Sequence, residues 1–113
     1  MKFKTFTFPN EPEQCSVLRE RRTVVHTLPK GQWQIEELGQ KPLVLRGEAV
    51  LTESSQYQAL ESLFQAGGVG LLITPVHAAF YAYLTALERI HEPVENYVRC
   101  RFTFVQAPEG DTP

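Results

Sequence analysis

Residues Val24 to Gly39, VVHTLPKGQWQIEELG, are the part of this chain that says most about its fold. The segment leaves an extended stretch, passes a Pro-Lys-Gly turn signal at 29–31, and places Trp33 ahead of a short acidic run. We expect Gln32 to Leu38 to be short and extended or irregular. Gly39 then permits a sharp change of direction, because glycine adopts φ values that other residues avoid. This pattern is not typical of an enzyme motif.

The segments around this stretch alternate between apolar and polar residues, as strands with one buried face do. We expect one strand over residues 2–8, stopped by Pro9, and one long strand from Ser16 to Leu28. Leu43 to Leu51 is a further strand. Within it, Gly47 interrupts the apolar row and indicates a bulge or a close approach by another segment.

One helix is predicted between the strands. Ser55 and Gln58 have the spacing of a capping box, with Ser54 as the alternative cap. The pair of glycines at 67–68 is expected to end the helix. Apolar residues recur at helical spacing between these limits, at Tyr57, Leu60, Leu63 and Phe64. We therefore expect this apolar stripe to pack on a sheet.

The second half of the chain contains one ambiguous segment. Val69 to Thr74 is an apolar run of strand length, closed by Pro75. The composition of His77 to Glu92 favours a helix, although extended pairing is also possible. Val98 to Phe104 alternates strictly, which predicts a half-buried strand with Cys100 on its apolar face.

Length and charge limit the class of protein. The 113 residues predict a single domain over 1–107, with a flexible tail at 108–113. A net charge of -2 argues against nonspecific nucleic-acid binding, which depends on clustered cations. No signal-peptide pattern and no apolar run of about 20 residues is present, so we expect a cytosolic protein with no membrane partner.

The sequence predicts no catalytic, cofactor or metal site. His26, His77 and His91 lack the short spacing of a metal-binding pair, and His26 is expected to be a core or interface imidazole. Cys15 or Cys100 with a histidine could form a nucleophile pair. A buried Cys100 would instead act as a small hydrophobe, and a disulfide is not expected in a reducing compartment.

Trp33 has two interpretations, a packing anchor inside the domain or an aromatic anchor at a subunit interface. The mixed charges at 19–22 are typical of a solvated strand face. We nevertheless predict that part of this charged run and the Trp33 segment together form an oligomer or partner interface. Its predicted members are Trp33, Ile35, Leu38, Arg21 and Arg22.

The order of several motifs resembles the N-terminal domain of Mu-type phage DNA circularisation proteins. The motifs are Val25 to Pro29, Trp33, Glu36 to Gly39, the strand from Leu43 to Val50, Gly70 to Pro75, and the pair Phe102 and Phe104. Small distal tail proteins of lambda-like phages are similar in size and layout. The functions of the longer C-terminal part of the circularisation proteins are not carried over.

The resemblance implies a tail-tube-like fold of the mainly β (α+β) class. Two antiparallel sheets would form a sandwich or partial barrel with one flanking helix. It also implies a long hairpin that pairs Ala79 to Ile90 with Asn96 to Gln106, against the helix propensity of the first of these segments.

The same resemblance implies a structural virion protein rather than an enzyme. Copies would form a ring, expected to be hexameric, at the distal end of the tail tube or in the baseplate. The ring would contact tube, baseplate or tip proteins and let DNA pass as cargo. The protein would assemble in the host cytoplasm and reside in the virion tail. Two alternatives stay open: a tailocin or contractile injection particle, and a small cytosolic enzyme or ligand-binding domain with a Cys/His site.

Overall fold

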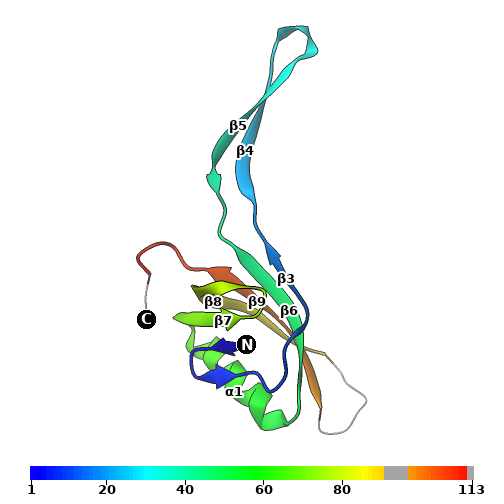
Figure 1. Ribbon diagram of the computed structural model, residues 1–113, viewed down its shortest axis with the longest axis vertical. Coiled ribbons are helices and arrows are strands. Elements are labelled where there is room, and N and C mark those ends of the chain that lie inside the picture. Colours follow the sequence, from blue (N-terminus) through cyan, green and yellow to red (C-terminus); the bar gives the residue numbers. More distant parts are fainter. Residues whose placement is uncertain (91–96, 112–113) are drawn as a thin grey trace.

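The structure, a computed structural model, describes residues 1–90 and 97–111 of the chain. It is mostly β, with one α-helix among these residues (Figure 1). The elements are β1 (Lys2–Phe3), β2 (Phe6–Thr7), β3 (Glu13–Leu18), β4 (Arg21–Thr27), the 3-10 turn η1 (Pro29–Gly31), β5 (Trp33–Gln40), β6 (Val44–Leu51), α1 (Ser54–Ala66), β7 (Val69–Thr74), β8 (His77–Ile90) and β9 (Val98–Gln106).

The strands form two antiparallel sheets, as the resemblance implied. The main sheet has seven strands in the order β2-β1-β7-β8-β9-β6-β3, and β4 pairs only with β5 in the second sheet. The seven-stranded order has two ends, so the described strands do not close into a barrel. The helix flanks the main sheet and contacts β8 and β6 (Figure 1).

The main sheet curls around its own core. Phe3 of β1 and Phe104 of β9 lie three strand positions apart, which would be about 14 Å in a flat sheet. Their ring centroids are only 4.8 Å apart. Leu60 of α1 is fully buried at the helix side of this core, whereas Phe64, which we expected in the same stripe, is exposed. The curled sheet and the helix therefore enclose one apolar core.

The ambiguous segment is a strand. β8 runs from His77 to Ile90 and pairs along β9, with Leu84 opposite Phe104 and Leu87 opposite Phe102. The local helix propensity was misleading, because two long neighbours supply a ladder of hydrogen bonds that a helix at this place would leave unmade. The turn expected at 92–96 lies outside the described residues, as do His91 and Asn96.

Two predicted strands are each divided in the structure. The segment 2–8 is a tight hairpin of β1 and β2, turning at Lys4 with a φ of 53°. The expected strand from Ser16 to Leu28 is broken at residues 19–20, where the chain leaves β6 and begins to pair with β5. Alternation of side chains continues across such a break, which is why the pattern alone joined the two parts.

The helix begins slightly earlier in the sequence than predicted. Glu53 is the N-cap and forms the capping box with Gln56, in place of Ser54 or Ser55 with Gln58. The glycine stop is confirmed, since Gly67 ends α1 with a φ of 68°. Lys4 Nζ donates a hydrogen bond of 2.7 Å to the Gly67 carbonyl, so the N-terminal hairpin also ties down this helix end.

The close approach predicted at Gly47 is confirmed. A Cβ at this position would lie 3.0 Å from the ring of Phe102 and 3.3 Å from the Cα of Cys15. The facing strand β3 has a bulge here, because its register to β6 shifts between Glu13 and Ser16. The absence of a side chain at Gly47 is what lets β3 and the Phe102 ring approach β6.

None of the described helices is both long and apolar enough to cross a bilayer.

Candidate interaction surface

The second sheet is an arm that projects from the body of the protein. We use "arm" for residues 21–40, which contain β4, η1 and β5. Figure 1 shows the arm standing away from the main sheet. The radius of gyration is 18.0 Å, against about 13 Å for a compact chain of this length. The extents of 63 × 34 × 24 Å reflect the same projection.

The arm is closed at its base by one pair of residues. The Lys41 backbone N–H donates to the Glu20 carbonyl at 2.9 Å, and the Lys41 ammonium pairs with the Glu20 carboxylate at 3.2 Å. At the tip, the Leu28 N–H donates to the Gln32 carbonyl at 2.8 Å around a turn in which Lys30 and Gly31 have positive φ. The arm is thus a hairpin that is closed by hydrogen bonds both at its base and at its tip.

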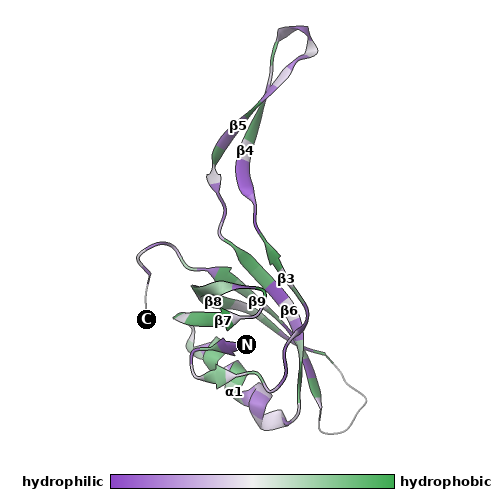
Figure 2. Ribbon diagram, viewed as in Figure 1, coloured by the Kyte–Doolittle hydropathy of each residue, from purple (hydrophilic) through white to green (hydrophobic). Residues whose placement is uncertain are grey.

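Every residue of the arm is exposed. A two-stranded ribbon is at best marginally stable in water, because neither of its faces is buried. Hydrophobic residues nevertheless interrupt the hydrophilic ones along both strands (Figure 2). Such a surface is typical of an interface that is completed by a partner.

One face of the arm carries three large apolar side chains, Val25, Ile35 and Trp33. Val25 lies directly opposite Ile35, and Thr27 lies opposite Trp33 on the same face. The exposed fractions are 62% for Val25, 50% for Ile35 and 66% for Trp33. We call these three side chains the arm face. At the base side of this face, Arg21 and Glu37 form an ion pair of 3.1 Å.

The opposite face of the arm carries Val24, Leu28 and Leu38 together with an ion pair. His26 Nε2 and the Glu36 carboxylate lie 2.8 Å apart, and both side chains are about half exposed. His26 is therefore not a core imidazole, contrary to one part of its prediction. The strand that carries it has no main-sheet neighbour behind it, so its valine and leucine neighbours do not bury the ring.

The structure places all five predicted interface residues on the arm. Trp33, Ile35 and Arg21 share the arm face, whereas Arg22 and Leu38 follow the alternation of the other face. Trp33 is the most exposed large apolar residue among those described, so its interpretation as an internal packing anchor is wrong. The Trp33 segment is also a regular strand rather than an irregular one.

Two details of the arm were missed or misplaced. Gly39 does not end the segment; it lies inside β5 with a φ of 105°, where the β4 register shifts between Arg21 and Thr23. Val25 was absent from the predicted set. The signal was available, because Val25 and Ile35 lie five residues on either side of Lys30 in the turn.

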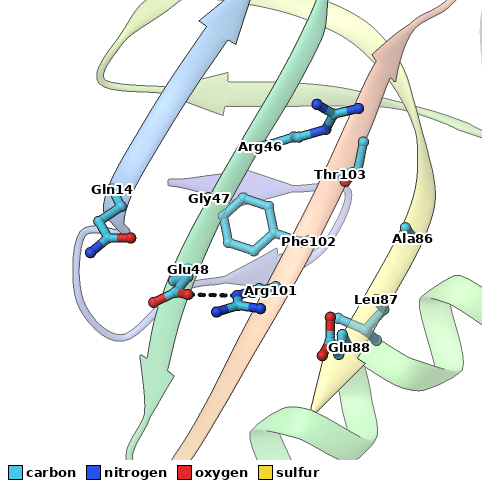
Figure 3. A pocket seen from close by; sticks show the side chains of 10 residues that line it. All are labelled: Gln14, Arg46, Gly47, Glu48, Ala86, Leu87, Glu88, Arg101, Phe102 and Thr103. Carbon is cyan, nitrogen blue, oxygen red and sulfur yellow. Dashed lines mark hydrogen bonds and ion pairs between the residues drawn. The ribbon is translucent and has the colours of Figure 1, made fainter. Parts of the chain in front are cut away.

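A hollow of about 310 Å³ lies on the main sheet, over β6, β9 and β8 (Figure 3). Two of its charged side chains, Glu48 and Arg101, are paired with each other. The Glu48 carboxylate accepts from Arg101 Nε at 2.6 Å and from Arg99 at 3.4 Å, and the Arg101 contact lowers the pKa of Glu48.

Among the described residues, neither cysteine is hydrogen-bonded to a histidine. Both are free thiols, and Cys100 is buried as predicted. Burial raises the pKa of Cys100 to about 11 and also raises the pKa of Cys15. Within residues 1–90 and 97–111, no three His, Cys, Asp or Glu side chains gather in a way that could hold a metal ion.

Comparison with known proteins gives a likeness at the level of structure. No protein family model matches the sequence, and no curated protein matches it. Among solved structures, the chain is similar to a protein in the tail of an empty GTA (gene transfer agent) particle, determined by helical refinement with C6 symmetry. The TM-score is 0.64 at 12% sequence identity, and the match covers 91% of this chain and 83% of that chain. The protein thus has the tail-tube-like fold of a subunit from that particle.

Proposed function

We propose that this protein is a structural subunit of a phage-tail-like particle and not an enzyme. In this proposal, its copies form a hexameric ring at the distal end of the tail tube or in the baseplate. The ring joins the tube to the tip and lets DNA pass through its lumen. The protein then resides in the virion tail after assembly in the host cytoplasm.

The observation that carries the proposal is the arm, a hairpin of 20 residues with no buried position. A free monomer would expose Val25, Trp33 and Ile35 on one face with nothing to cover them. Large aromatic and branched apolar side chains grouped in this way act as anchors in protein–protein contacts. An exposed apolar arm of this kind suits a protein that assembles with other copies or partners.

Two further observations support a ring. The solved tail protein with the same fold belongs to a particle of C6 symmetry. The sequence resemblance to phage tail proteins leads to the same class of assembly. A net charge of -2 also suits a channel that DNA crosses without adhering, because adhesion to phosphate requires clustered cations.

Excision of the arm tests the proposal. Replacing residues 21–40 by Asn-Gly would join Glu20 to Lys41 through a two-residue turn, which suits the hydrogen-bonded pair at the arm base. We expect the wild-type protein to form rings or tubes in electron micrographs at micromolar concentration or on isolated tail tubes. The excised variant should keep its thermal unfolding midpoint and remain monomeric.

Two results would contradict the proposal. One is a wild-type protein that stays monomeric both alone and with tail tubes. The other is an arm-less variant that assembles as the wild type does.

A further inference from the structure

The main sheet carries a second apolar surface, on the face that points away from the core. Five side chains from five neighbouring strands lie directly opposite one another in a single row across the sheet. Their pairing is continuous from β3 to β7. We call them the outer row: Leu18, Val44, Val105, Tyr83 and Val69.

The outer row is only partly covered. The residues beside it in sequence, such as Leu45, Phe104 and Leu84, point inward and are buried, whereas Val44, Val105 and Tyr83 are half-buried and Leu18 is 43% exposed. Leu71 and Tyr81, which lie opposite each other on β7 and β8, extend the apolar surface along these strands and are also exposed.

A groove borders the outer row where the arm leaves the body. It has a volume of about 190 Å³, and its apolar walls are Leu18, Pro42, Val44 and Val105. Pockets for small molecules usually measure about 300–1,000 Å³, so this groove suits a side chain better than a cofactor. Arg22 lines the same groove, together with Lys41 and Glu20, which form an ion pair with each other.

We infer that the outer row and this groove receive the arm of a second copy of the chain. In this contact, Trp33 of the second copy enters the groove, and its Val25 and Ile35 lie on the outer row. The inference rests on the proposed function and adds to it the surface that accepts the arm.

The groove cannot be filled by the arm of its own chain. Trp33 follows the turn at the arm tip, whereas the groove lies at the arm base. The seven residues of β4 separate the two ends by about 20 Å at 3.3 Å per residue. A hydrogen-bonded ribbon does not fold back over this distance, so an arm that enters the groove must come from another copy of the chain.

Charge favours the same pairing. Glu37 lies on the same face of the arm as Ile35, and Arg22 lies at the rim of the groove. Docking the arm face on the outer row would bring the Glu37 carboxylate toward the Arg22 guanidinium. Complementary charges around an apolar contact fix its orientation and speed association.

The two surfaces are different parts of one chain, so the contact is head-to-tail. An interface of this kind closes into a ring or continues along a stack, according to the rotation that relates successive copies. In such an assembly, each subunit inserts its arm into one neighbour and receives the arm of the other neighbour in its groove.

This geometry allows a mixing experiment. An arm-blocked variant carries Trp33→Ser and Ile35→Ser, and a groove-blocked variant carries Val44→Asp, with Leu18→Asp as a second, edge-strand version. Val50→Asp is the matched control, because Val50 lies on the same face of β6, is also half-buried, and is outside the outer row. Mass is measured by light scattering after size exclusion, with circular dichroism to check folding.

We expect the wild type and Val50→Asp to assemble, and each blocked variant alone to be monomeric. An equimolar mixture of the two blocked variants should give dimers and nothing larger, since one intact arm meets one intact groove.

Three outcomes would overturn the inference. If both groove-blocked versions assemble as the wild type does while the arm-blocked variant stays monomeric, the arm docks elsewhere and the proposed function survives. If the mixture stays monomeric, the head-to-tail pairing is wrong. If the wild type never assembles, the proposed function fails together with the inference.

Discussion

Val25 and Ile35 lie directly opposite each other across the arm, and at least half of each side chain is exposed to solvent. Pairs of branched apolar residues in this arrangement stabilise a sheet when a third layer covers them. Here the third layer is missing within the chain. The pair therefore contributes little to folding and is available for association.

The double variant Val25→Ser/Ile35→Ser should change the free energy of unfolding by less than about 0.5 kcal/mol, as is usual for exposed positions. The comparison variant is Leu45→Ala in the core, which should cost about 2–5 kcal/mol because Leu45 is fully buried. Urea unfolding measures both. A large decrease in the free energy of unfolding of the arm variant would mean that the arm packs on the body of the protein in solution.

Trp33 is the only tryptophan in the chain, so its fluorescence reports on the arm alone. In the monomer, an indole that is 66% exposed should be readily quenched by iodide. On assembly the emission should shift to shorter wavelength and quenching should fall severalfold, because the ring leaves water. The Trp33→Phe variant is the control, because its remaining fluorescence does not come from tryptophan. Unchanged quenching in verified assemblies would show that the arm is not part of the contact.

Gly47→Ala should destabilise the protein by about 1–3 kcal/mol, because the new methyl group would overlap the Phe102 ring and press on the β3 backbone. Phe102→Leu alone should also destabilise. In the double variant the two losses should be less than additive, since the smaller side chain makes room for the methyl group. Chemical denaturation of all four proteins completes the cycle, and strict additivity would refute the proposed clash.

The contacts of Glu48 predict a dependence of stability on pH. Its carboxylate is hydrogen-bonded to Arg101, which holds the pKa of Glu48 below its usual value in the folded state. The stabilisation is therefore fully present above the ordinary glutamate pKa and is lost as the pH falls through the lowered folded value. Glu48→Gln should be less stable than the wild type at neutral pH, and the difference should vanish in acid.

Urea midpoints between neutral pH and acid test this prediction. Glu109→Gln, at an exposed position, is the control and should follow the wild type throughout. A difference for Glu48→Gln that stays constant into acid would assign the loss to packing instead of charge.

The two thiols should differ in reactivity in the folded protein. Cys15 is partly exposed, whereas Cys100 is buried and has a pKa raised to about 11, so its nucleophilic thiolate is scarce at neutral pH. A thiol reagent at pH 8 should modify one site slowly and the second only after unfolding. Cys15→Ser should abolish the first reaction. Rapid labelling of Cys100 without denaturant would contradict the burial of β9.

Much of the fold was accessible from residue patterns, because those patterns are local. The alternation in Val98 to Phe104 and in Leu43 to Leu51 identified β9 and β6 with the correct buried faces. Gly67 marked the helix end, since its φ requirement does not depend on distant contacts. The β8 strand was different: its composition favoured a helix, and only pairing with β7 and β9 made it extended.

The candidate interface was found only in part. Trp33, Ile35 and Leu38 were singled out by residue type, but nothing local distinguished an exposed arm from a buried strand. The outer row was missed altogether. Its members come from five strands that the sequence separates by up to 87 positions, from Leu18 to Val105, and they meet only through the sheet register.

The sequence by itself determined where the helix ends and, apart from β8, which segments are extended, because side-chain periodicity and glycine geometry act over a few residues. Tertiary structure alone decided which apolar sides became core and which stayed open. Val25 and Leu45 belong to similar alternating strands, yet one stands on an arm and the other faces Phe104. Burial depends on what lies across the chain in space, and that is fixed by strand order and sheet curvature rather than by neighbours in sequence.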